Sequence, residues 1–189
     1  MDVYKGIQEF YNSYVQLEQI KRTGWVMRNV PAERLESVAD HTLQVIMLAV
    51  TLNNELKLNF DISKLSQMCF IHDIGEAIIG DISEIDVDYD EKKKRERQAV
   101  TNLLRPLSEE TRNLYIELWL EMEEQSTLVA QYAYQVDKLD AVLKAKKYAK
   151  DYNMPELFRE FYEYQLSKGT FSNSPLRELF LSLDPTKKD

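Results

Sequence analysis

The spacing of apolar residues along the chain predicts helices in nearly every segment. Apolar side chains recur every three or four positions, and no extended alternation of apolar and polar residues indicates a sheet. Gly and Pro occur only 5 times each, so few positions interrupt the helical pattern. The predicted helices cover residues 3–20, 37–56, 61–72, 91–104, 109–123, 128–150, 155–166 and 174–183.

Breaks in the apolar pattern mark the ends of these helices. Residues 22–31 are irregular, and a run of acids follows Gly80 as far as residue 90. Asp61 can cap the helix that follows it, while Pro106 and Ser108 supply a break and a new cap. No internal repeat or flexible linker divides the sequence. We therefore expect an all-α fold in which residues 1–189 form a single compact helical bundle.

Size and charge narrow the functions that this bundle can have. With 44% hydrophobic residues, a chain of 189 residues can bury one sizeable core. Its 24 basic and 32 acidic side chains give a net charge of −8, which argues against broad binding to a nucleic-acid polymer. Local basic residues could still hold one small phosphate, so we expect a small-molecule partner.

The sequence carries no pattern of a secreted or membrane protein. The N-terminus lacks a signal-peptide pattern, and the longest aliphatic stretch, residues 45–50, is too short to cross a bilayer. The single cysteine, Cys69, excludes an internal disulfide and fits a reducing cytoplasm. Its apolar spacing indicates a buried structural thiol. We expect a cytoplasmic protein with no membrane partner.

The two histidines of the chain are the first candidates for chemistry. His41 ends the segment SVADH, His72 begins HDIGE, and Asp137 begins DKLD, which gives the order His, His-Asp, Asp. Imidazole nitrogens together with carboxylate oxygens suit a divalent cation such as Mn, Fe, Co, Mg or Zn. His72 and Glu76 are spaced one helical turn apart, which predicts that both lie on one helix face with Asp73 beside them.

Each candidate ligand also has a structural explanation. His41 shares a predicted core face with Val45, where a histidine is commonly hydrogen-bonded within the core. Asp73 could be an ion-pair partner, Glu76 a solvated acid, and Asp137 a partner of Lys138 or Lys144. However, Asp137 lies on an interior stripe of alanines, where a lone carboxylate is unfavourable unless it is paired, protonated or bound to metal. The joint occurrence of all four patterns favours a metal site.

The ordered motifs resemble those of the HD-domain metal-dependent phosphohydrolases, in the branch of 5′-deoxynucleotidases and HD-domain-containing protein 2. The resemblance covers about residues 16–150 and is strongest in RTGW, ESVADH, HDIGEA, GDI and DKL. A C-terminal helical extension follows. The resemblance implies an HD-domain bundle, a divalent metal held by His41, His72, Asp73 and Asp137, and removal of the 5′-phosphate from deoxynucleoside monophosphates.

The same resemblance implies roles for four other residues. Glu76 would orient or deprotonate the attacking water. Asp81 would act as a second catalytic acid and accept a hydrogen bond from the sugar 3′-hydroxyl, although a turn acid after Gly80 explains it equally well. Arg22 would bind phosphate and Trp25 would form a wall for the sugar or base. Without the resemblance, Arg22 is expected at the surface and Trp25 in the core. Related enzymes also imply a homodimer.

Alternative functions remain open at this point. One is another HD phosphohydrolase, acting on an alarmone, a nucleoside triphosphate or a cyclic dinucleotide. A second is a non-catalytic scaffold, which the presence of Glu76 and Asp81 does not favour. The basic cluster 92–95 invites a phosphate-binding role, but neighbouring acids largely cancel its charge, so a solvated helix face is the preferred interpretation.

Overall fold

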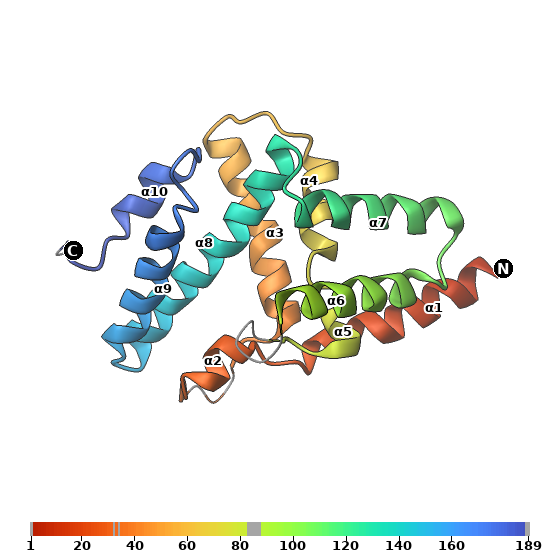
Figure 1. Ribbon diagram of the computed structural model, residues 1–189, viewed down its shortest axis with the longest axis horizontal. Helices are drawn as coiled ribbons and strands as arrows, with labels where there is room; N and C mark the ends of the chain where they lie inside the picture. The colour runs from red at the N-terminus through yellow and green to blue at the C-terminus, as the bar shows by residue number, and fades with distance from the viewer. Residues whose placement is uncertain (1, 32, 34, 83–87, 188–189) are drawn as a thin grey trace.

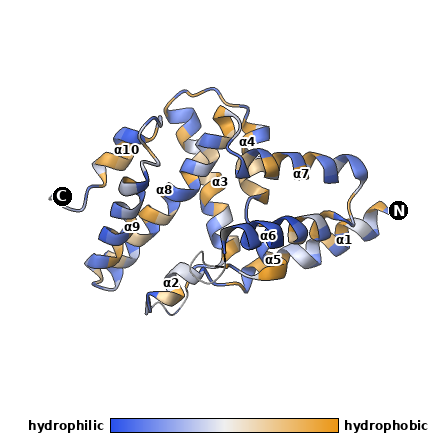
Figure 2. Ribbon diagram, viewed as in Figure 1, coloured by the Kyte–Doolittle hydropathy of each residue, from blue (hydrophilic) through white to orange (hydrophobic). Residues whose placement is uncertain are grey.

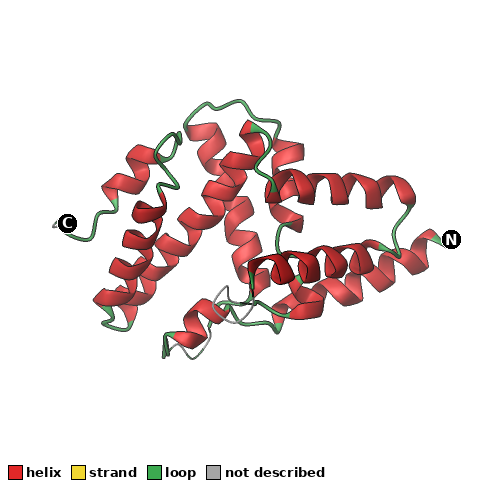
Figure 3. Cartoon of the chain, viewed as in Figure 1, coloured by secondary structure: helices red, strands yellow, loops and turns green. Residues whose placement is uncertain are grey.

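The computed structural model describes residues 2–31, 33, 35–82 and 88–187. Within these ranges the elements are helices, without a strand, which confirms the predicted all-α fold (Figures 1 and 3). The elements are α1 (Val3–Tyr14), the 3-10 helix η1 (Val15–Glu18), α2 (Thr23–Met27), α3 (Val38–Glu55), α4 (Ile62–Ile71), α5 (Glu76–Ile79), α6 (Tyr89–Leu104), α7 (Glu109–Glu123), α8 (Leu128–Asp151), α9 (Pro155–Lys168) and α10 (Arg177–Ser182). No described helix has the length and apolar character needed to span a bilayer.

Side-chain caps fix where several helices begin. Ser37 starts α3 with a reciprocal capping box, in which its hydroxyl accepts from the Asp40 backbone N–H and the Asp40 carboxylate accepts from the Ser37 backbone N–H. Asp61 and Ser108 cap α4 and α7, as predicted. The capping box sets the start of α3 only one turn before His41, so it also fixes the position of that histidine.

The central helices α3 and α4 join two groups of helices. In Figure 1, α8, α9 and α10 lie to one side of them and α1, α5, α6 and α7 to the other. One cluster of buried apolar residues extends through both groups, from Val45 on α3 to Phe180 on α10. Figure 2 shows α6 as mainly hydrophilic, but its last turns bury Ala99, Val100 and Leu103. The two groups therefore share a core.

Three predicted segments differ from the structure. The helix predicted at 3–20 changes to a 3-10 helix after Tyr14, and the irregular stretch 22–31 contains α2. The helix predicted at 61–72 ends at Ile71, and residues 72–75 form a turn before α5. His72 and Glu76 therefore do not share one continuous helix. Residues 83–87, within the predicted acidic break, lie outside the described residues.

Helix α6 packs closely against this turn. A Cβ atom at Gly75 would lie 3.1 Å from Val100 Cγ2 and 3.3 Å from the backbone oxygen of Glu96. A side chain at this position would require Val100 or the α6 backbone to shift, so glycine favours this approach. The turn therefore brings α6 next to the residues that follow His72.

Candidate metal centre

The four predicted ligands converge from three helices. His41 lies on α3, His72 and Asp73 follow α4, and Asp137 lies on α8. The Nε2 atom of His41 is 3.3 Å from His72 Nε2 and 3.1 Å from Asp137 Oδ1, and His72 Nε2 is 3.1 Å from Asp73 Oδ2. Ligand atoms bonded at about 2.1 Å to one cation, at right angles, lie about 3 Å apart. The separations among His41, His72 and Asp73 fit one shared divalent cation, and Asp137 adjoins this group through its contact with His41.

Hydrogen bonds behind the two imidazoles orient their free nitrogens. His72 Nδ1 lies 2.7 Å from the backbone oxygen of Cys69, and His41 Nδ1 lies 2.7 Å from Asp140 Oδ2. The backbone oxygen of Cys69 can only accept a hydrogen bond, and so can the ionised carboxylate of Asp140. Nδ1 therefore carries the hydrogen in each ring. In a neutral ring, Nε2 then keeps its lone pair for a metal ion, which is the usual arrangement of a metal-bound histidine.

Charge around His41 also fits a cation. Burial and the Arg22 cation oppose a charged imidazole, yet hydrogen bonds to Asp137 and Asp140 outweigh them and raise the pKa of His41 to about 9. The side chain of His41 is fully buried. Without a metal ion, a proton on the imidazole balances the negative charge of these two carboxylates. Metal binding would release that proton.

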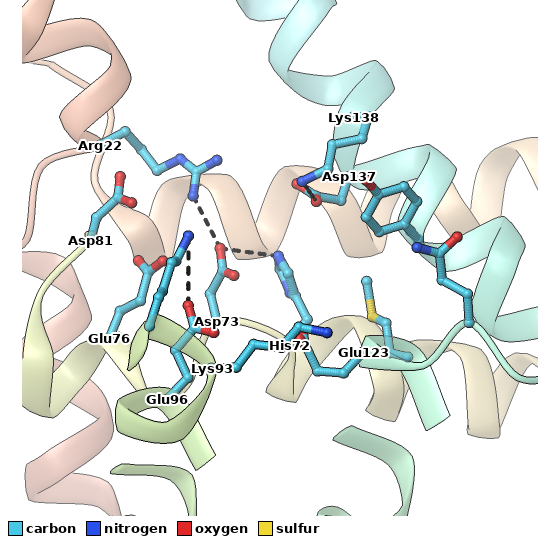
Figure 4. A pocket seen from close by; sticks show the side chains of 14 residues that line it. Arg22, His72, Asp73, Glu76, Asp81, Lys93, Glu96, Glu123, Asp137 and Lys138 are labelled. Carbon is cyan, nitrogen blue, oxygen red and sulfur yellow. Dashed lines mark hydrogen bonds and ion pairs between the residues drawn. The ribbon is translucent and has the colours of Figure 1, made fainter. Parts of the chain in front are cut away.

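A cavity of about 280 Å³ opens beside the ligands (Figure 4). Its walls come from the segment before α2, the turn after α4, α5 with the residues that follow it, and helices α6, α7 and α8. This volume approaches the lower end of typical small-molecule sites, about 300 Å³. The lining residues are Arg22, His72, Asp73, Glu76, Asp81, Lys92, Lys93, Glu96, Met122, Glu123, Gln125, Tyr134, Asp137 and Lys138.

Arg22 and Asp81 both line this cavity. The Arg22 backbone N–H donates to the Glu36 backbone oxygen over 3.1 Å, and its guanidinium donates to Asp73 over 3.1 Å. Asp81 accepts a 2.7 Å hydrogen bond from the backbone N–H of Thr23, the first residue of α2. Asp81 therefore lines the cavity and also stabilises the start of a helix, so the two interpretations of it are compatible.

Glu76 is the most unusual acid of the cavity. It begins α5 and is 9% exposed, and its Oε2 atom has no hydrogen-bond partner in the part of the chain that the structure describes. Burial, followed by the charges of Asp73 and Asp81, raises the pKa of Glu76 well above its usual value. A buried carboxyl group beside a cavity, with a free oxygen and a raised pKa, is suited to proton transfer.

Trp25 does not line the cavity, in contrast to the predicted contact with sugar or base. Its indole is 2% exposed and stacks on Phe161, with ring centroids 4.7 Å apart, while Tyr148 packs at its edge. The indole fills an apolar space against α8 and α9, and its Nε1–H donates to Glu36 over 3.5 Å. Its position matches the core interpretation of Trp25.

The interpretation of the basic cluster 92–95 as a solvated helix face is wrong for two of its lysines. Lys92 and Lys93 line the cavity, whereas Lys94 and Arg95 are exposed and Arg95 pairs with Glu91. Helical periodicity separates these two pairs, since α6 turns one face toward the cavity. Lys92 and Glu96 are spaced one helical turn apart, and this spacing is the sequence signal that could have indicated a shared inward face.

A buried network behind His41 was not predicted from the sequence. Asp140 lies one turn after Asp137 on α8 and contacts the far nitrogen of His41. Glu36, also buried, pairs with Lys144 over 2.7 Å. Lys138 pairs with Asp137 instead, at 2.8 Å. The spacing of Asp137 and Asp140 on one helix face is the signal that could have identified this second carboxylate.

Replacing Asp140 with asparagine should weaken metal binding by about 10- to 100-fold, because partners of metal-bound histidines typically contribute that much. The amide keeps the shape but no longer holds the Nδ1 hydrogen of His41 as an ionised carboxylate does. Titration calorimetry of the metal-free protein with Mn²⁺ measures the effect. Asp151→Asn, at the exposed end of the same helix, is the control; equal affinities in both variants would contradict this role.

Comparisons with known proteins identify the family of this chain. The family described as the HD domain matches residues 14–174. The Mus musculus protein named 5′-deoxynucleotidase HDDC2 is 33% identical over 180 residues, covering 95% of this chain and 87% of that protein. Two solved structures are similar: a conserved hypothetical protein from Pyrococcus furiosus (31% identity, TM-score 0.75, 92% and 96% of the two chains) and PH0347 from Pyrococcus horikoshii (26%, 0.78, 95% and 99%). The chain therefore belongs to the HD-domain family.

Proposed function

We propose that this protein is a metal-dependent 5′-deoxynucleotidase, which hydrolyses deoxynucleoside 5′-monophosphates to deoxynucleosides and phosphate. The observation that carries the proposal is the cluster of His41, His72 and Asp73, with Asp137 in contact with His41, beside a cavity that Glu76 also lines. Relatives named 5′-deoxynucleotidase, from mouse and human among others, match 95% of the chain at 33% and 32% identity. Both lines of evidence support the same reaction class.

A divalent cation held by these four ligands would polarise a phosphate oxygen and lower the pKa of a water molecule. Arg22 would bind the phosphate, because a guanidinium has five N–H donors and, among the described residues, its hydrogen bond to Asp73 uses one Nη1 donor. Glu76 would accept a proton from the attacking water and return it to the leaving 5′-oxygen. The P–O bond to the 5′-oxygen breaks as the bond to the water oxygen forms.

Asp81 would bind the sugar in this proposal. One of its oxygens accepts from Thr23, and an ionised carboxylate keeps further acceptor sites for a 3′-hydroxyl. Trp25 would support the site from behind through Glu36, since its indole is buried away from the cavity. Because Trp25 does not line the cavity, Asp81 and its neighbours would determine the selectivity for deoxyribose.

Deoxynucleoside 5′-monophosphates should be hydrolysed about 10-fold or more faster, in kcat/KM, than ribonucleotides, because an extra 2′-hydroxyl would crowd the sugar end of the cavity. The base should matter little and 3′-monophosphates should fail. Phosphate release from a nucleotide panel, repeated with Mn²⁺, Co²⁺, Fe²⁺, Mg²⁺ and Zn²⁺ after chelation, measures this. Higher activity on triphosphates would instead favour another HD phosphohydrolase, and inactivity on every substrate would favour a scaffold.

The proposal includes a cytoplasmic homodimer. The single cysteine, Cys69, is fully buried as a free thiol, which fits a reducing compartment. The apolar side chains of Val3, Tyr4, Ile7 and Tyr11 on α1 are more than half exposed, which supports a contact between subunits. Sedimentation velocity of the purified chain distinguishes a dimer from a monomer.

A further inference from the structure

Helix α6 carries a cation into the same cavity. Because Gly75 allows α6 to approach the turn after His72, Lys92 and Glu96 lie over the segment that contains Asp73 and Glu76. A smaller recess of about 30 Å³ is lined by Asp73, Glu76 and Glu96 together, and Figure 4 shows these three acids grouped on one side of the cavity. Lys92 thus reaches the cavity from a different element than Arg22.

Lys92 is held less tightly by its ion pair than Arg22 and Lys138, two other cations that line the cavity. Arg22 lies 3.1 Å from Asp73, and Lys138 lies 2.8 Å from Asp137. The Lys92 Nζ atom is 3.7 Å from Glu96 Oε1, beyond a direct hydrogen bond, and both side chains are 21% exposed. The ammonium group therefore keeps donors for a ligand without breaking a short ion pair.

The charge of Lys92 also reaches the proton-transfer residue. Burial raises the pKa of Glu76 and of Glu96, and the Lys92 cation opposes this rise in both. Lys92 and Glu76 line the same cavity as Asp73, where the substrate phosphate would be attacked. Cations placed there stabilise the negative charge of a transferring phosphoryl group.

We propose that Lys92 is a catalytic residue that contacts a non-bridging oxygen of the substrate phosphate, as a second cation beside Arg22. The ligand class is a phosphate monoester dianion, and inorganic phosphate shares the same oxygens. This inference rests on the proposed phosphohydrolase function. It assigns to the cavity the part of the basic cluster that faces inward, and leaves Lys94 and Arg95 in solvent.

Lys92→Ala should lower kcat/KM for deoxynucleoside 5′-monophosphates by about 100-fold, which is the lower end of the range for losing a group that stabilises transition-state charge. The affinity for inorganic phosphate, measured as product inhibition, should fall in the same variant. Lys92→Arg should recover part of both. Lys94→Ala, exposed on the same helix and outside the cavity, should resemble the wild type.

Two further measurements separate this inference from its alternatives. Mn²⁺ affinity and thermal unfolding should be unchanged in Lys92→Ala, because Lys92 is not a ligand; weaker metal binding or a lost fold would overturn a direct phosphate contact. Calorimetric binding of inorganic phosphate to the Mn²⁺-loaded protein tests Lys92 even if the wild type hydrolyses no deoxynucleotide. Wild-type phosphate affinity and activity in Lys92→Ala would overturn the inference and leave the proposed function intact.

Discussion

Replacing His72 with alanine is expected to weaken Mn²⁺ binding by more than about 100-fold and to abolish measurable turnover. The Nε2 atom of His72 lies 3.3 Å from His41 Nε2 and 3.1 Å from Asp73, so the change removes one of four converging ligands. Partners outside the ligand shell typically contribute about 10- to 100-fold in affinity, and a direct ligand should contribute more. Calorimetric titration and phosphate release, both after chelation and metal replacement, measure the two effects.

The fold should survive this substitution. His72 reaches the cavity edge, and Trp119 holds the turn through a hydrogen bond to the backbone oxygen of His72, which alanine retains. His41 is fully buried, so its replacement would disturb the core more. Circular dichroism confirms the helical content, and Asp73→Ala provides an independent ligand variant. Near-wild-type activity in either variant would end the assignment of the metal site.

Local signals explain why much of the fold could be predicted. The predicted helices 109–123 and 128–150 correspond to Glu109–Glu123 and Leu128–Asp151. Ser108 and Thr127 cap them through hydrogen bonds to backbone N–H groups only three residues away. Apolar periodicity and such caps are contained within one segment, so no tertiary contact is needed to infer them.

Contacts between distant segments account for what the sequence did not reveal. The helix predicted through His72 ends at Ile71, and the turn that follows packs against α6, a segment about 20 residues further along the chain. Asp140 is 99 positions from its partner His41. The aromatic rings that bury Trp25 come from α8 and α9. The ligands themselves were accessible because their order along the chain matches a family pattern.

The environment of Glu76 sets the sign of its effect on stability. Its pKa is raised in the folded protein by burial and then by Asp73 and Asp81. A carboxyl group with a raised folded-state pKa contributes most to stability below its unfolded pKa, and this contribution is lost as the pH rises through the folded value. In the metal-free protein, replacing Glu76 with a neutral residue should therefore increase stability relative to the wild type once the pH reaches the folded-state pKa of Glu76.

Glu76→Gln should lower kcat by about 10²- to 10⁴-fold, the usual contribution of a general acid or base, while metal affinity changes little. Glutamine keeps the size of the side chain but cannot exchange a proton with water or the leaving oxygen. Single-turnover phosphate release measures the rate, and thermal unfolding of the metal-free variant across pH tests the predicted gain in stability. Glu124→Gln, an exposed change next to the end of α7, should leave both unchanged. Wild-type turnover in Glu76→Gln would remove Glu76 from the mechanism, and a lower melting temperature at every pH would show that its carboxylate is needed for the fold instead.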